Sequence, residues 1–367
     1  MRGHAPQHPQ AVKHLAPGWF RSFACAAGTC PDSCCRAGWE IVVDEETQNT
    51  YASLPGEDGA RVRAALRRDE EVLLRQDGDR VCVLLDDDGL CHAQRCFGHE
   101  RLCRVCREYP RFHREFGNLT EHGLSLSCPT AFRLAVENAP CWDAWEDDAP
   151  IVPNDLDPER YLLLREGRQL ALGLLAREDL PFWDRLELVW ALACRLQRGL
   201  DGGKRTGKAA LRRLSSPIGQ KAVLRDVRRY FGTLPWPGLR QGCLMEEALA
   251  LPRWIDTFAG LEILSPGWKQ SLQELRLRLD AGRVPDGYLI PERPEIYARY
   301  LWCSLYKYWL DAADDGQLLA RVRRSAAMTL LGLAMDRVLP AERSCLQRIS
   351  REIEHCEDNL ETLLKRL

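Results

Sequence analysis

Cysteine is the residue type in this chain with the clearest potential for chemistry. The 367-residue sequence contains 16 cysteines, and ten of them fall between Cys25 and Cys128. Thiolates are the ligands of iron–sulfur clusters and of many structural zinc sites. In a reducing cytosol a dense block of cysteines is more often a metal site than a disulfide framework, and disulfide-stapled domains are usually shorter and secreted. The block therefore predicts metal binding.

The cysteines occur in short groups within loop-forming sequence: CAAGTCPDSCC at 25–35, Cys82, CHAQRC at 91–96, CRVC at 103–106, and Cys128. A [4Fe–4S] cube needs four thiolates, usually from loops that can wrap around it. Structural zinc also needs four ligands, typically as two paired knuckles, and only Cys103 with Cys106 and Cys30 with Cys34 have such spacing. The pattern therefore favours an iron–sulfur cluster, with zinc as the alternative metal.

The adjacent pair Cys34 and Cys35 limits the ligand set further. Because Cys35 follows Cys34 directly, the C-x3-C-x2-C signature of radical S-adenosylmethionine enzymes does not occur in the chain. Neighbouring side chains point apart, so we expect one of the two to bind metal and the other to pack or support it.

The remaining cysteines and the nearby histidines have more ordinary interpretations. Five cysteines in helical sequence are expected to pack as small hydrophobes: Cys194, Cys243, Cys303, Cys345 and Cys356. Three others are open between packing and a supporting role: Cys96, Cys103 and Cys141. Four histidines are expected to be solvent-facing or hydrogen-bonded loop residues: His92, His99, His113 and His122. His92, beside Cys91, is also a candidate ligand or partner of a ligand.

Several strings, in this order, resemble the CxxCxxCC-type iron- or zinc-chelating proteins and, among them, the flagellin lysine N-methylases. They are FACAAGTCPDSCCRAGWEIVVDEET (23–47), CVLLDDDGLCHAQ (82–94), LCRVCREYPR (102–111), LSLSCPTA (124–131) and REIEHCEDNLETLL (351–364). The resemblance is dense in the cysteine region and thin in the rest of the chain. Each string is weak alone, and the ordered combination is fairly specific.

This resemblance implies an enzyme that carries a [4Fe–4S] cluster and transfers a methyl group from S-adenosylmethionine to surface lysines of flagellin. By position, the family's cysteines correspond to Cys25, Cys30, Cys34, Cys35, Cys82, Cys91, Cys106 and Cys128. The favoured ligands are Cys30, one of Cys34 and Cys35, Cys91 and Cys106, with Cys25 in reserve. Participation of Cys82 and Cys128 stays open. The family's Asn-Tyr pair in a late helix is Ile296-Tyr297 here, so a role of that Asn does not carry over by position.

Lysine methylation would need the neutral amine, whose pKa in a free side chain is about 10.4. An enzyme must therefore desolvate the amine or supply a base or phenol that orients its lone pair. Tyr297, Tyr300 and Tyr308 could line such a site or simply pack, and Glu108 with Tyr109 is a second possibility. No glycine-rich strand–turn–helix of the usual methyltransferase type occurs, so catalytic and cofactor-binding residues are not assigned.

A different class of function competes with the enzyme. The chain could be an iron- or zinc-binding module without activity, acting as a metal sensor, store or assembly factor. The long helical part after the cysteine block favours a role that handles a substrate.

The amino-acid composition limits the classes of partner that the chain could bind. The chain is 45% hydrophobic and 28% charged with a net charge of −2, so no basic excess exists to neutralise nucleic-acid phosphates. No apolar run approaches the ~20 residues that span a membrane, and the first residues contain no apolar signal region. We therefore expect a cytoplasmic protein with a protein substrate, no nucleic acid and no membrane partner.

The elements that must position the cysteines are predicted to be mainly helical. Residues 1–150 form an irregular cysteine-rich metal-binding region with short strands at 40–44 and 81–85, and with a helix after Asp44 as its N-cap. A Pro- and Asp-rich linker covers 147–155, and residues 151–367 form an all-α bundle. Its helices are predicted at 158–176, 181–198, 207–230, 246–258, 268–280, 294–311 and 317–338.

A single closing helix after Pro340 is predicted from one apolar stripe with spacings of three and four residues. The stripe consists of Leu346, Ile349, Ile353, Cys356, Leu360, Leu363 and Leu367.

Overall fold

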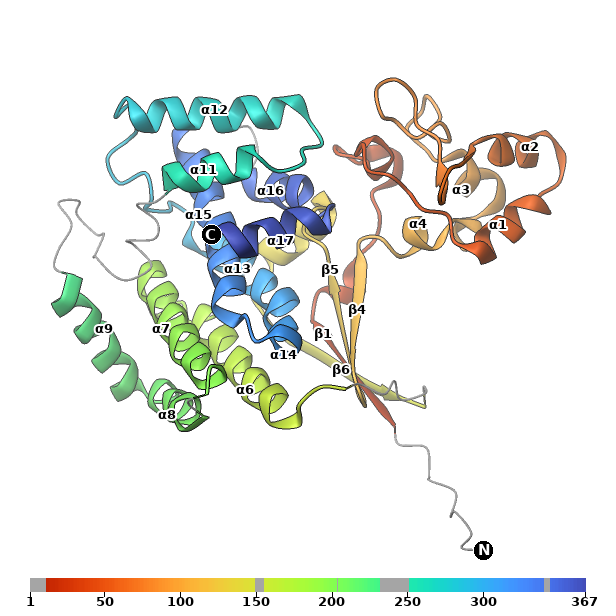
Figure 1. Ribbon diagram of the computed structural model, residues 1–367. Helices are drawn as coiled ribbons and strands as arrows, with labels where there is room; N and C mark the ends of the chain where they lie inside the picture. Colours follow the sequence, from red (N-terminus) through yellow and green to blue (C-terminus); the bar gives the residue numbers. More distant parts are fainter. Residues whose placement is uncertain (1–10, 149–154, 203, 232–250, 340–343) are drawn as a thin grey trace, which may run out of the picture. The chain divides into compact units, whose positions relative to one another are not determined.

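Strands from both ends of the cysteine block pair into one four-stranded sheet. It is seen in a computed structural model that describes residues 11–148, 155–202, 204–231, 251–339 and 344–367. The strands are β1 (Val12–Pro17), β4 (Arg111–Phe116), β5 (Leu119–Leu124) and β6 (Trp142–Asp147), in the order β4-β5-β1-β6 (Figure 1). β1 is parallel to β5 and antiparallel to β6. The cysteine-rich chain between β1 and β4 is thus held at both ends by one sheet.

The hairpin of β4 and β5 explains two glycines in its sequence. Gly117, with a φ of 66°, and Asn118 form the two-residue turn, a position where a positive φ favours glycine. Gly123 pairs with Phe112, and a Cβ at Gly123 would lie 2.3 Å from the Phe112 ring. The ring therefore packs across the neighbouring backbone, which only glycine allows.

Short helices and turns occupy the chain between β1 and β4. They are η1 (Phe20–Ser22), η2 (Ala27–Thr29), η3 (Cys34–Arg36), α1 (Glu45–Ala52), α2 (Gly56–Ala64), α3 (His92–Phe97), η4 (His99–Arg101) and α4 (Arg104–Glu108), with the small hairpin β2 (Leu66–Arg68) and β3 (Val72–Leu74). The predicted N-cap is confirmed, because Asp44 Oδ1 accepts the Thr47 N–H at 3.0 Å.

A small core holds these elements together. Its buried residues are Val43, Tyr51, Leu54, Val62, Ala65, Leu74, Leu84, Ala93, Leu102 and Cys103. Tyr51 is 1% exposed, and its hydroxyl accepts the Cys103 N–H at 3.1 Å. Cys82, Cys91 and Cys106 pack against the edge of this core, half-buried. The thiols are therefore held by a hydrophobic cluster and not only by loops.

The predicted strands at 40–44 and 81–85 are wrong. Val42 makes only an isolated bridge to Leu73, Cys82 one to Gln76, and Leu85 one to Cys91. Apart from these single bridges, both segments are irregular chain within the cysteine region. The strands that do form the four-stranded sheet lie in segments for which the sequence predicted no secondary structure.

Helices alone make up the rest of the described chain. After α5 (Pro129–Glu137) they are α6 (Pro158–Leu175), α7 (Phe182–Leu200), α8 (Lys204–Leu214), α9 (Pro217–Phe231), α11 (Leu251–Ala259), α12 (Pro266–Asp280), α13 (Pro294–Tyr308), η5 (Trp309–Asp311), α14 (Ala312–Asp315), α15 (Leu318–Val338), α16 (Cys345–Ile353) and α17 (Glu357–Arg366). The prediction of a mainly α fold is confirmed. α15 is buried along most of its length, as its Leu330 and Met335 illustrate at 0% exposed.

The chain divides into two compact units. The first comprises Met1–Leu134 with Trp142–Pro150, and the second Ala135–Cys141 with Ile151–Leu367. Most of the predicted linker at 147–155, the start of the predicted helix at 246–258, Pro340 and Cys243 lie outside the described residues.

Two of the predicted helices are each two helices. The segment 207–230 is broken between α8 and α9, where Pro217 begins the second helix and Gly219 donates its N–H to Ser216 Oγ at 3.1 Å. The closing segment is broken between α16 and α17, with Cys356 as the N-cap residue of the second helix.

The second break takes Cys356 off the buried stripe. Its thiol is half-exposed, 3.8 Å from a Glu262 carboxylate oxygen. Asn359, in the first turn of α17, anchors that helix to the segment after α11, since its side chain accepts the Glu262 N–H at 2.9 Å and donates to the Glu262 carbonyl at 2.8 Å. The side chains of Leu346, Ile349, Ile353 and Leu363 are buried as predicted.

Candidate metal centre

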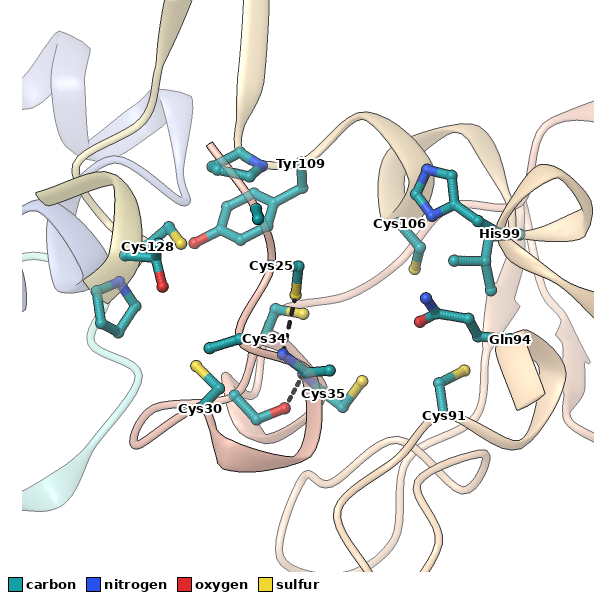
Figure 2. A pocket seen from close by; sticks show the side chains of 18 of the residues that line it. Cys25, Cys30, Cys34, Cys35, Cys91, Gln94, His99, Cys106, Tyr109 and Cys128 are labelled. Carbon is teal, nitrogen blue, oxygen red and sulfur yellow. Dashed lines mark hydrogen bonds between the residues drawn. The ribbon is translucent and has the colours of Figure 1, made fainter. Parts of the chain in front are cut away.

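Seven cysteines line one cavity of about 320 Å³ in the first unit (Figure 2). They are Cys25, Cys30, Cys34, Cys35, Cys91, Cys106 and Cys128. All six predicted metal ligands are among them, together with Cys128. Cys82 is not a lining residue; its N–H donates to the Cys35 carbonyl at 2.9 Å. Four segments that are distant in sequence therefore present thiols to one space.

Tight turns place the first four thiols. Cys25 Sγ accepts the Ala27 N–H at 3.3 Å, and the Cys30 N–H donates to the Ala27 carbonyl at 3.0 Å. Ser33 caps the next turn, η3, where its Oγ accepts the Cys35 N–H at 3.3 Å. Figure 2 shows Cys34 and Cys35 between Cys91 and Cys106 on one side and Cys30 and Cys128 on the other.

Two glycines bring the first cysteine loop against the loop that precedes Cys91. A Cβ at Gly28 would lie 3.2 Å from the Asp88 carbonyl oxygen and 3.2 Å from the Leu90 side chain. Gly89 has a φ of 79°, and its Cβ would lie 3.3 Å from the Gly28 carbonyl oxygen. A Cβ at either position would require the facing loop to shift by a few tenths of an ångström, and at Gly89 it would also be strained by the positive φ.

Burial and neighbouring thiols disfavour the ionised thiolate form of the cavity cysteines. Burial raises the pKa of Cys128 to about 11, and the charges of Cys30 and Cys25 add to the effect. Burial likewise raises the pKa of Cys30 and of Cys91, each with a contribution from Cys34. Without a cation these thiols therefore stay protonated at neutral pH, and a bound metal is what would hold them as thiolates.

The closest thiol pairs show the same effect more strongly. A hydrogen bond with the Cys35 thiol, followed by burial, raises the pKa of Cys34 far above its ordinary value. For Cys106, a hydrogen bond with the Cys103 thiol is the larger cause and burial the next, and together they raise the pKa of the Cys106 thiol. Cys103 itself is 0% exposed and belongs to the small core, which supports the packing interpretation for it.

The histidines fit the expectation only in part: His99 and His113 are exposed as predicted, whereas His92 is buried and His122 is half-buried. His92 is buried in α3, His113 lies on β4 and His122 on β5, and His99 in η4 lines the cavity. The reason is that the β4–β5 hairpin and the short helix α3 were not predicted from these polar stretches.

A stacked group on the sheet had not been expected at all. His14 Nδ1 and His122 Nε2 are 2.8 Å apart, and the His14 ring stacks on Trp145 at 5.0 Å between centroids. His14 Nε2 is 3.0 Å from an Asp147 carboxylate oxygen, and the Arg21 guanidinium lies 4.3 Å from the Trp145 ring. The group joins β5, β1 and β6, and only the pairing of distant strands brings it together.

The tyrosines of α13 are packed within the helical unit. Tyr297 donates to Asp336 at 2.8 Å, Tyr308 donates to Glu354 at 2.9 Å, and the Tyr300 hydroxyl is 2.9 Å from Ser350 Oγ. All three are less than a tenth exposed. These contacts favour packing over a role in substrate binding. Tyr109, in contrast, lines the thiol cavity, with its hydroxyl 3.0 Å from Ser127 Oγ.

The fold and the cavity together define a mainly α protein whose smaller unit, built on a mixed sheet, gathers cysteine thiols around one space. In comparisons with known proteins the chain matches no family model, no curated protein and no solved structure. Within the described part of the chain, none of the helices has the length and apolar character needed to cross a membrane.

Proposed function

We propose that the thiol cavity binds a [4Fe–4S] cluster and that the chain is a protein-lysine N-methyltransferase acting on flagellin with S-adenosylmethionine. The observation that carries the metal part is the convergence of seven thiols, from four separate segments, on one cavity. Cysteines that merely pack would be distributed through the core, as Cys103 and Cys345 are.

The arrangement of the thiols supports a cluster over a single zinc ion. Four ligands of one zinc ion must lie in a tight tetrahedron. Among the described residues, no three cysteine sulfurs lie within 4.8 Å of one another. A cubane binds each thiolate to a different iron, so its ligands stand further apart. Zinc remains the alternative metal.

The favoured ligands are Cys30, one of Cys34 and Cys35, Cys91 and Cys106. Because Cys128 lines the same cavity, it joins Cys25 as a reserve ligand. When bound, the cluster would supply a fixed centre around which the loops are ordered. The protein's own residues already hold those loops through backbone hydrogen bonds and the close approach of Gly28 and Gly89.

The methylase part of the proposal rests on the resemblance of the cysteine strings and the closing helix to the flagellin lysine N-methylases. Tyr109 lies in the string LCRVCREYPR and faces the cavity, so its phenol is the candidate group for orienting a lysine amine. The helical unit would then bind the protein substrate. A non-enzymatic iron- or zinc-binding module is the second candidate, because the cavity alone accounts for metal binding.

One assay separates these functions. Protein purified without oxygen is incubated with flagellin and S-adenosylmethionine labelled in the methyl group, and flagellin peptides are analysed by mass spectrometry. The methylase predicts label on lysine with the wild type and with Cys141→Ser, an exposed cysteine, and none with Cys106→Ser. An iron-loaded wild type that transfers no label would leave only the metal-binding module.

A further inference from the structure

Asp58, His92 and Cys96 bring three metal-binding atoms together outside the thiol cavity. His92 and Cys96 lie one turn apart on α3, and Asp58 comes from α2. His92 Nε2 is 3.2 Å from Asp58 Oδ1 and 3.7 Å from Cys96 Sγ, and all three donor atoms lie within 4.8 Å of one another. The group unites a nitrogen, an oxygen and a sulfur donor, a set suited to zinc.

The spacing fits a tetrahedral ion. With bonds of about 2.0 Å to nitrogen and oxygen and about 2.3 Å to sulfur, tetrahedral ligand atoms stand about 3.3 Å (N to O) and about 3.6 Å (N to S) apart. The two observed distances from His92 Nε2 lie close to these values. A metal ion could therefore enter with small side-chain adjustments.

The Nδ1 side of the imidazole faces a carboxylate and a guanidinium. His92 Nδ1 is 3.4 Å from an Asp86 carboxylate oxygen, and Asp86 accepts from Arg61 Nη2 at 2.7 Å. A carboxylate behind the ring is the usual arrangement that orients a metal-bound histidine. Arg61 Nη1 is nearer to Nδ1, at 3.1 Å, and can only donate, so metal binding at Nε2 requires the tautomer in which Nδ1 carries the proton and donates to Asp86 instead. Arg61 and Arg95, the latter 3.4 Å from Asp86, hold that carboxylate in place.

The three candidate ligands differ in burial, which places the site at the surface of the first unit. His92 is 8% exposed, whereas Asp58 and Cys96 are exposed. Three protein donors at the surface leave the fourth position to water. We propose that Asp58, His92 and Cys96 bind one divalent cation of the zinc class, separate from the centre in the thiol cavity. The ion would clamp α2 to α3 and fix His92, the neighbour of the cavity residue Cys91.

The test measures zinc and iron in the same full-length samples. Anaerobically purified protein is dialysed against a zinc buffer, and both metals are quantified by mass spectrometry in wild type, Asp58→Asn and Cys96→Ser. The matched controls are Asp87→Asn and Cys141→Ser, which alter exposed residues of the same types. Loss of one zinc equivalent in the first two variants alone, with iron unchanged, is the expected result.

Unchanged zinc in Asp58→Asn and Cys96→Ser would overturn the site and leave His92 in a metal-free ion-pair network. Loss of zinc together with iron would also overturn it, because the two centres would then not be separate. X-ray absorption at the zinc edge of the wild type supplies a check without mutation, with one sulfur among the ligands expected. If the thiol cavity took zinc instead of a cluster, a sulfur-rich zinc would persist in both variants, so failure of the two proposals is distinguishable.

Discussion

Cys30 and Cys106 face the thiol cavity from different segments, whereas Cys356 caps a helix at the surface of the other unit. We predict that Cys30→Ser and Cys106→Ser each abolish retention of iron and acid-labile sulfide, because each removes a thiolate that a cubane requires. Cys356→Ser should retain both in full. Colorimetric iron and sulfide analysis of anaerobically purified variants measures the effect.

Circular dichroism of each variant is the control, since serine is close in size to cysteine and the helices should be unchanged. Equal loss of iron from Cys356→Ser would contradict the division between cysteines that line the cavity and cysteines outside it. One equivalent of zinc in the wild type, without iron or sulfide, would show that the cavity binds zinc and not a cluster.

Sequence alone brought six cavity cysteines into one hypothesis, because thiol chemistry is narrow and the strings that contain them resemble one family. It did not find Asp58 as a partner of His92, since α2 and α3 meet only in the folded chain. The His92-x3-Cys96 spacing, one helical turn, was a usable signal for that pair. The contact between His14 and His122 could not be predicted from local sequence, because 108 positions separate the two residues.

Among the elements, α1 and α4 share one carboxylate. Asp44 accepts the Thr47 N–H and hydroxyl at the start of α1, at 3.0 and 2.8 Å, and the Arg104 N–H at the start of α4, at 3.0 Å. Loss of an N-cap side chain costs about 1 to 2 kcal/mol. We predict that Asp44→Ala lowers the free energy of unfolding by at least that amount and weakens iron retention, because α4 carries Cys106. Urea titration and iron analysis measure the two effects, with exposed Glu45→Ala as control.

The same carboxylate predicts a dependence on acid. Partial burial of Asp44 opposes ionisation, but the hydrogen bonds from Arg104 and Thr47 outweigh it and lower the pKa from 3.8 to about 2. The contribution of Asp44 is therefore fully present above pH 3.8 and is lost as the pH falls toward 2. The stability difference between wild type and Asp44→Ala should shrink over that window, and a constant difference would refute the capping argument.

The elements also show why helix and strand prediction succeeded unevenly. Long apolar stripes such as that of α15 predict helices well, because burial repeats with the helical period. The break before Pro217 had a usable signal, because proline disrupts a helix interior and favours the first turn of a new helix. The break at Cys356 has no proline, and the apolar periodicity runs through it. Strand β4 has the sequence RFHREF, in which charged residues outnumber apolar ones, and its pairing with β5 is what makes it a strand.

At the scale of the whole molecule, the sheet that holds the cysteine region contains a pH-sensitive histidine, His122. Burial, followed by the charges of His14 and His113, lowers the pKa of His122 to about 4, although Asp147 acts in the opposite direction. His122 is thus neutral in the fold, and unfolding lets it take up a proton below its ordinary pKa of 6.5.

We predict that stability is unaffected by this group above pH 6.5 and falls as the pH drops from there toward 4. The loss should be on the order of 1 to 2 kcal/mol, because solvent reaches the half-buried ring and screens its neighbours. Unfolding midpoints of wild type and His122→Gln across this range isolate the effect from the titrating carboxylates. Parallel curves would show that His122 does not contribute.

The two units should also respond differently to removal of the metal. The first unit has a small core beside the thiols that would bind the proposed cluster, while the second has helix α15, which is buried along most of its length. We predict that oxidation and chelation of the cluster accelerate backbone hydrogen exchange between residues 25 and 106 and leave residues 318–338 unchanged. Hydrogen-exchange mass spectrometry with and without the cluster measures this, and equal acceleration in both segments would contradict it.

The place of β1 in the sheet has a consequence for synthesis of the chain. β1 is made first but is an inner strand, and its partners β5 and β6 follow the cavity residues Cys25 to Cys106. At a translation rate of roughly 5–20 residues per second, about 5 to 20 seconds separate β1 from β5 on the ribosome. Cys128 completes the cavity still later. During that interval the nascent thiols would be open to oxidants and to competing metals, so the proposed cluster would have to be inserted after the β4–β5 hairpin emerges.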